Sequence, residues 1–158
     1  MSKIGKYAHN TEAKKLKKIL ILVGIIAIAA ASFVAFKMLQ PLPENLDLAT
    51  TRTTEQGHYL VTVSPEEQDY QRNSLHSWIV EVSTPDGTPV KGAKITIDGG
   101  MPQHGHGLPT SPQMTADLGD GRYKIEGVRF NMRGWWEFKL AIDADGTSDN
   151  ITFNLVMN

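Results

Sequence analysis

Hydrophobic positions divide the chain into two parts with different periods. The stretch at 19–36, ILILVGIIAIAAASFVAF, is an unbroken apolar run without charge or proline. From Gly57 onward, short apolar runs are separated by glycine, proline and aspartate turns. The first pattern predicts one long helix, and the second predicts a series of short strands.

The apolar run matches the thickness of a membrane. A helix of that length spans about 27 Å, close to the ~30 Å hydrocarbon core of a bilayer. Six lysines and a single glutamate precede it, at Lys3, Lys6, Glu12, Lys14, Lys15, Lys17 and Lys18. Because positively charged flanks stay in the cytoplasm, we predict a basic cytoplasmic tail at 1–18 and a transmembrane helix at 19–39, with the remainder exported.

A cleaved signal peptide is the alternative for this segment, since Ala29 and Ala31 offer a cleavage site of the A-x-A type. The long N-terminal region and the long apolar run favour an anchor instead. Residues 40–56 are polar, contain two prolines and lack any period, which predicts a linker. The exported domain is then expected at 57–158.

Seven strands are expected in this domain. They lie at 58–64, 75–83, 93–98, 113–117, 122–128, 135–144 and 150–157. Short strands at this spacing, with Pro-Asp-Gly and Gly-Asp-Gly turns between them, predict an all-β fold: an immunoglobulin-like antiparallel β-sandwich of about seven strands. Trp78, Trp135 and Trp136 are expected in its core and rim.

Composition excludes several classes of function. The formal net charge is −1, and binding of nucleic acid requires a basic face. The glycines do not follow the spacing of a phosphate or dinucleotide loop, so no nucleotide is expected. Because the chain has no cysteine, it can form neither a disulfide nor a thiolate metal site.

The segment at 99–112, GGMPQHGHGLPTSP, is the candidate for chemistry. Its prolines stiffen the chain and its glycines permit sharp turns. In extended backbone, His104 and His106 lie on the same side, so both imidazoles can reach one metal ion. Imidazole suits copper, zinc, iron and nickel, and a thioether shifts the preference toward Cu(I).

Three further residues are candidates to complete such a site: Met101, His76 and Met132. A purely structural role without a metal remains the alternative, because an H-G-H triplet is a short pattern and His76 or Met132 can equally serve as packing residues. Asp143, Asp145 and Asp149 lack the spacing of a calcium loop and are expected to be turn formers with solvated carboxylates.

The motifs His76-Ser77-Trp78, Met101-Pro102-Gln103-His104-Gly105-His106 and Met132-Arg133-Gly134-Trp135-Trp136 resemble the FixH/YtkA-like group of bacterial proteins. The resemblance covers about residues 57–157. It implies a single-pass protein of the bacterial inner membrane with a periplasmic immunoglobulin-like domain, in the neighbourhood of copper handling and maturation of haem–copper oxidases. This sequence has one Met in the loop, whereas methionine-rich copper carriers have several.

Two functions therefore remain in competition. The first is a membrane-anchored module that binds copper and delivers it to a respiratory oxidase or another membrane complex. The alternative is a structural or accessory subunit of a membrane complex, without a metal, that docks through the Pro/Gly loop and Trp135–Trp136. An enzyme is not expected, since the chain has neither a G-x-S-x-G nor an H-E-x-x-H motif.

Overall fold

The computed structural model describes residues 3–38, 41–68 and 70–158, and its side chains are described from residue 14 to 36 and throughout the two later ranges. The chain forms two units, Met1–Pro41 and Leu42–Asn158. The first unit contains helix α1, Lys3–Met38, which begins far upstream of the predicted residue 19. Its predicted end at Leu39 lies outside the described residues.

The helix has the composition of a membrane span. Between Lys14 and Phe36, its most apolar 18 residues have a mean hydropathy of 2.9, and none of them is buried within the protein. A helix of 23 residues is long enough to cross a bilayer. The helix is therefore compatible with a single-pass membrane anchor.

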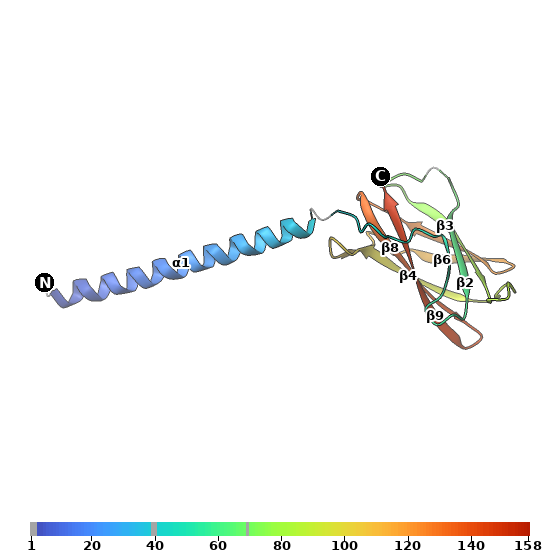
Figure 1. Cartoon of the computed structure of the whole chain (residues 1–158), viewed down its shortest axis with the longest axis horizontal. Coiled ribbons are helices and arrows are strands. Elements are labelled where there is room, and N and C mark those ends of the chain that lie inside the picture. The colour runs from blue at the N-terminus through green and yellow to red at the C-terminus, as the bar shows by residue number, and fades with distance from the viewer. Residues whose placement is uncertain (1–2, 39–40, 69) are drawn as a thin grey trace. The chain divides into compact units, whose positions relative to one another are not determined.

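The second unit is a sandwich of two antiparallel sheets (Figure 1). Its strands are β1 Thr51–Thr53, β2 Leu60–Pro65, β3 His76–Ser83, β4 Lys94–Met101, β5 His106–Gly107, β6 Gln113–Gly119, β7 Arg122–Val128, β8 Gly134–Ala144 and β9 Thr147–Met157. One sheet has the order β1-β2-β3-β7-β6, and the other has the order β5-β4-β8-β9. The predicted β-sandwich behind one N-terminal helix is confirmed.

The strand order is that of an immunoglobulin domain. Without β1, the first sheet corresponds to strands A-B-E-D, and the second sheet corresponds to C′-C-F-G. All seven predicted strands are present, and the two additional strands, β1 and β5, have only three and two residues. Strands this short carry too few residues to show an alternation in the sequence.

Aromatic side chains fill the space between the sheets. Trp78 on β3 and Phe138 on β8 are buried, with their ring centroids 5.6 Å apart. Phe130 contacts both Trp78 and Trp136 edge-on. Since burying one large apolar side chain contributes about 1.5–3 kcal/mol, this cluster is a main source of stability. Trp135 is half-buried, as expected for the rim.

Part of the stretch predicted as a linker is bound to the domain. Strand β1 pairs with β2, which places it in the first sheet. The same segment also bonds to the second sheet. Glu55 N donates to Asn150 O at 2.9 Å and Arg52 Nη1 donates to Thr152 O, and both acceptors lie on β9. We call residues 47–55 the strap, because they close one open side of the sandwich.

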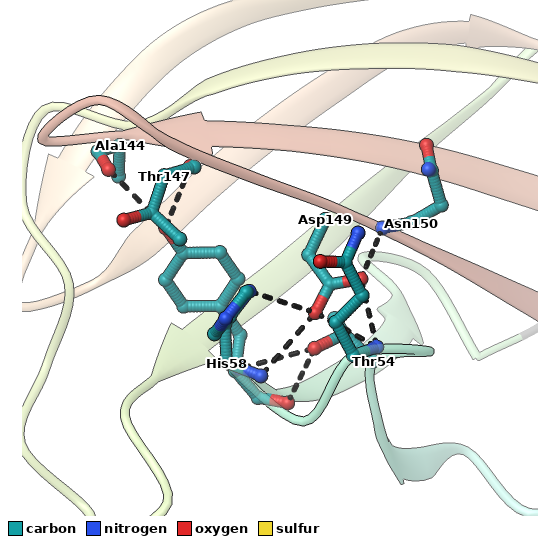
Figure 2. A network of polar contacts seen from close by, with 8 residues as sticks. Thr54, His58, Ala144, Thr147, Asp149 and Asn150 are labelled. Carbon is teal, nitrogen blue, oxygen red and sulfur yellow. Dashed lines mark hydrogen bonds and ion pairs between the residues drawn. The ribbon is translucent and has the colours of Figure 1, made fainter.

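The carboxylate of Asp149 fastens the turn between β1 and β2 to β9 (Figure 2). Asp149 is 1 % exposed, so the prediction of a solvated turn former is wrong for this residue. Its oxygens accept from Gln56 N at 3.1 Å and His58 N at 3.2 Å, and His58 Nδ1 lies 3.4 Å away. The partners lie more than 90 positions earlier in the chain, which local sequence does not reveal.

Burial on its own would raise the pKa of the Asp149 carboxyl. The hydrogen bonds that it receives from the Thr54 hydroxyl and from the backbone N–H groups of Gln56, Asn150 and His58 lower that pKa below its usual value. The carboxylate is therefore stabilised as an anion, and its oxygens already accept hydrogen bonds from the protein. It is a structural group of the fold.

Candidate functional site

The two loop histidines lie on a short hairpin. Strand β4 continues through Met101, beyond the predicted end at residue 98, and turns directly into β5. Within the turn, His104 N and Gly105 N both donate to Met101 O, at 3.0 and 2.9 Å. Residues 100–107, which we call the histidine hairpin, are thus fixed by backbone hydrogen bonds rather than by proline alone.

Glycines allow the strands of this hairpin to approach closely. A Cβ added at Gly100 would lie 2.3 Å from His106 O and 2.8 Å from Gly107 Cα. A Cβ at Gly99 would lie 2.2 Å from Glu137 O on β8. Only glycine fits at these two positions. Gly100 therefore lets β4 and β5 approach closely, and Gly99 lets β4 approach β8.

The hairpin brings the two imidazoles together. The ring centroids of His104 and His106 lie 5.7 Å apart, with the ring planes at 73°. His104 is half-buried and His106 is exposed. A metal–nitrogen bond of about 2 Å places each centroid about 3 Å from the ion, so rings that share an ion have centroids no more than about 6 Å apart. The observed separation fits a shared ion.

Met101 is the methionine that lies opposite a loop histidine in the β4–β5 strand pairing. It pairs directly with His106 across the β4–β5 ladder, so the two side chains leave the same face. Its side chain is buried, and its Cε lies 3.3 Å from the position of a Cβ added at Gly134 on β8. The thioether therefore lies at the base of the hairpin, against the start of β8.

Carboxylates do not extend this pair into a larger cluster. Among the described side chains, at 14–36, 41–68 and 70–158, no three His, Cys, Asp or Glu residues are close enough to hold a metal ion. A hollow of about 390 Å³ beside His106 is lined by Glu137 and Lys139, among others. These two form an ion pair at 2.8 Å, and the hydrogen bond that Lys139 donates to Glu137 raises the pKa of Lys139. The Glu137 carboxylate is thus already paired with the ammonium group of Lys139.

His76 is held by contacts of its own. Its Nε2 lies 2.9 Å from Gln71 O, and its ring packs against Tyr70 and Phe130 at centroid distances of 5.2 and 5.7 Å. A carbonyl accepts, so Nε2 is the donor. Nδ1 is buried without a hydrogen-bond partner. A ring nitrogen opposite a donated N–H is the arrangement of a ligating histidine, but among the described residues His76 belongs to no group of three His, Cys, Asp or Glu side chains.

Met132 belongs to the connection between β7 and β8. Its side chain is half-buried against the core, and its carbonyl accepts from Trp136 Nε1 at 3.1 Å. The starts of β3 and β8 and the ends of β4, β7 and β9 all lie at one end of the sandwich. We call it the hairpin end. The five predicted ligands share this end, where the rings of His104 and His106 are neighbours and Met101 pairs with His106.

The opposite end of the sandwich carries the four turns at 54–59, 84–93, 119–122 and 144–147, and we call it the acidic end. A hollow of about 590 Å³ lies there, beside His58 and Tyr59. The Tyr59 hydroxyl already bonds Thr147 O at 2.9 Å. Burial, and then the charges of Asp143, Asp145 and Asp149, raise the Tyr59 pKa. The Tyr59 hydroxyl and the Asp149 carboxylate at this end thus make hydrogen bonds within the fold.

Comparison with known families shows to which protein family the chain belongs. A family model described as YtkA-like matches residues 53–141, which is more than half of the chain and includes the histidine hairpin. The chain belongs to the YtkA-like family. No curated protein matches.

One solved structure agrees with the fold of this YtkA-like domain, and a second resembles it less closely. A DUF4426 family protein from Pseudomonas aeruginosa PAO1 superposes with a TM-score of 0.51 at 15% identity, over 69% of this chain and 96% of that chain. The ZirS C-terminal domain gives a TM-score of 0.38 at 13% identity, over 73% and 81%. The first of these supports the β-sandwich.

Proposed function

We propose that this YtkA-like protein is a membrane-anchored accessory protein whose periplasmic domain binds copper at the histidine hairpin and delivers it to, or helps assemble, a respiratory oxidase or another membrane complex. The anchor is α1, with the N-terminus in the cytoplasm. The ligands are His104 and His106, with the Met101 thioether as third ligand. His76 and Met132, the other two candidates from the sequence, are not part of the proposed site.

The observation that carries this proposal is the 5.7 Å separation of the two imidazole rings on a hairpin whose backbone is already fixed. A fixed loop does not have to be ordered by the ion, so more of the binding energy is retained. Two imidazoles with a thioether, and with the nearby carboxylate paired to Lys139, form a soft donor set. Such a set favours Cu(I) over calcium, magnesium or manganese.

Copper titration of the purified full-length chain in detergent tests the site. Cu(I) is measured under reducing conditions against a chromogenic chelator, and Cu(II) is titrated separately. We expect the double variant H104A/H106A to lose at least about 100-fold in Cu(I) affinity, since it removes both nitrogen ligands. M101L, which keeps the volume but removes the sulfur, should lose about tenfold for Cu(I) and less for Cu(II).

A matched control is H58Q, which changes an exposed histidine at the acidic end. It should bind copper with the wild-type affinity. An unchanged affinity in H104A/H106A would contradict the copper site. Because the described residues hold no group of three His, Cys, Asp or Glu ligands, the metal-free accessory subunit is the second candidate. Stoichiometric co-purification with a membrane complex, together with no copper by elemental analysis, would favour that candidate.

A further inference from the structure

Strand β4 is paired on one side only over most of its length. The second sheet has the order β5-β4-β8-β9, and β5 pairs with β4 only at Gly100 and Met101. Leu108 N donates to Gly99 O at 3.1 Å, which is the next bond along. In the part of the chain that the structure describes, no strand pairs with residues 94–98 on the side away from β8. We call residues 94–98 the open edge.

The bond to Leu108 fixes which backbone groups the open edge presents. Because Gly99 O accepts from Leu108 N, the main-chain groups of Gly99 point away from β8. In an antiparallel strand the N–H and the C=O of one residue point to the same side, and the side alternates along the strand. Ile95 and Ile97 therefore each present an N–H and a C=O at the open edge. Such groups form a template for pairing with another strand.

The side chains of the open edge alternate between the two faces of the sheet. Ile95 is buried and Ile97 is half-buried against the core. Lys94, Thr96 and Asp98 are exposed on the outer face. They form a row with a cation at one end, a hydroxyl group at the centre and a carboxylate at the other end. This row is complementary to a reversed copy of itself.

We infer that the open edge pairs with the open edge of a second copy of this chain, antiparallel and centred on Thr96. Thr96 lies opposite Thr96 of the second copy, and Lys94 lies opposite Asp98. Ile95 lies opposite Ile97, and each such pair exchanges two main-chain hydrogen bonds. The second sheets of the two copies then continue into one another across a two-fold axis.

The open edge has room for this pairing and no more. At one end, Leu108 already lies opposite Gly99. At the other end, Val90 N donates to Val82 O of β3 at 3.0 Å, so the chain ahead of β4 belongs to the first sheet. The pairing needs only residues 94–98 of each copy. It therefore displaces neither β5 nor the segment that leads into β4.

Charge selects the register. Lys94 and Asp98 of the two copies meet at non-hydrogen-bonded positions, where facing Cα atoms lie about 4.5 Å apart and side chains are closest. Opposite charges at such positions stabilise a pair of strands, and like charges destabilise it. A register shifted by two residues would place Thr96 opposite Lys94 or Asp98 and lose both ion pairs. Since the two-fold axis repeats each contact, every charge counts twice.

The pairing keeps the two histidine hairpins apart. Gly100 and its counterpart in the second copy lie on opposite sides of the axis, eight strand positions from each other, or about 27 Å. Each copy therefore retains its own pair of His104 and His106, and no ion is shared between copies. The inference goes beyond the proposed function and does not depend on the copper site.

Disulfide trapping of the full-length chain in detergent tests the pairing. The native sequence has no cysteine, so T96C supplies one thiol in each copy. Facing Cα atoms about 4.5 Å apart are within the range of about 4.4–6.8 Å that a disulfide spans. The matched control is A141C, at an exposed position opposite Thr96 on β8. In the pairing, residue 141 lies three strand spacings from its counterpart, or about 14 Å.

Under mild oxidation, T96C should give at least about fivefold more disulfide-linked dimer than A141C on a non-reducing gel. Equal yields from the two variants would overturn the inference. The copper titration of H104A/H106A would be unaffected by that result, because the open edge contains none of the proposed ligands.

Charge reversal tests the register. In the T96C background, K94D places carboxylates opposite each other at both ends of the pairing and should lower the dimer yield at least about fivefold. K94D/D98K restores opposite charges with their signs exchanged, so the yield should return to within about twofold of that of T96C. A yield that K94D does not lower, or that K94D/D98K does not recover, would overturn the register centred on Thr96.

Discussion

The two ends of the sandwich use polar residues in opposite ways. At the acidic end, Asp149 is buried and receives hydrogen bonds from backbone groups that lie more than 90 residues away. At the hairpin end, His104 and His106 face one another on an accessible hairpin fixed through the backbone. The first arrangement consumes its side chain in holding the fold. In the second, the turn is fixed by main-chain hydrogen bonds to Met101 O, and the two imidazoles lie side by side, where a ligand could bind both.

Removing the Asp149 side chain should give the largest loss of stability. D149A leaves the N–H groups of Gln56 and His58 without their anionic acceptor, so we expect the free energy of unfolding to fall by about 3 kcal/mol. Urea unfolding of the full chain in detergent, followed by tryptophan fluorescence, measures this change. D145N, at an exposed turn position with positive φ that asparagine tolerates, is the control and should cost less than about 0.5 kcal/mol. Equal losses in the two variants would remove the structural role of Asp149.

A methyl group added to the hairpin should have the next largest effect. In G100A the new Cβ meets His106 O at 2.3 Å, so the strands must separate. We expect a cost of about 2 kcal/mol and, because His106 moves, a roughly tenfold loss of Cu(I) affinity.

Gly107, the cross-strand partner of Gly100, supplies the matched control. A Cβ at Gly107 lies 3.5 Å from Gly99 O, an ordinary contact. G107A should therefore change stability by less than about 0.5 kcal/mol and leave copper affinity within about twofold of wild type. If both variants behaved alike, the close approach of the two strands would not be what positions His106.

Acid should weaken the acidic end specifically. The folded state lowers the pKa of Asp149 below its value in the unfolded chain, which is about 3.9. The stabilisation it provides is complete above the unfolded pKa and is lost as the pH falls through the lower folded pKa. Wild type should therefore lose more stability than D149N between pH 6 and pH 2.5, as measured by urea unfolding at each pH. Parallel curves for the two proteins would show that Asp149 is not the group responsible.

How much the sequence could predict differs between these two ends. The strands and the histidine pair follow from local pattern, since alternation and the H-G-H triplet involve neighbouring residues. The burial of Asp149 and the docking of the strap do not, because their partners lie about 90 to 107 positions apart. The buried state of Met101 was also not evident: β4 continues through two glycines, which usually mark a loop, because their missing side chains permit the strands to come close.

The smallest effect should come from the histidine that the structure uses for packing. H76F keeps the ring against Tyr70 and Phe130 and removes the unpartnered Nδ1 together with the bond to Gln71 O. Because a gain and a loss oppose each other, we expect the free energy of unfolding to change by less than about 0.5 kcal/mol. Copper affinity should stay within about twofold of wild type, since the His76 ring packs between Tyr70 and Phe130 and donates to Gln71 O. A tenfold loss of affinity with unchanged stability would instead make Nδ1 a ligand, and the site would then reach across both sheets.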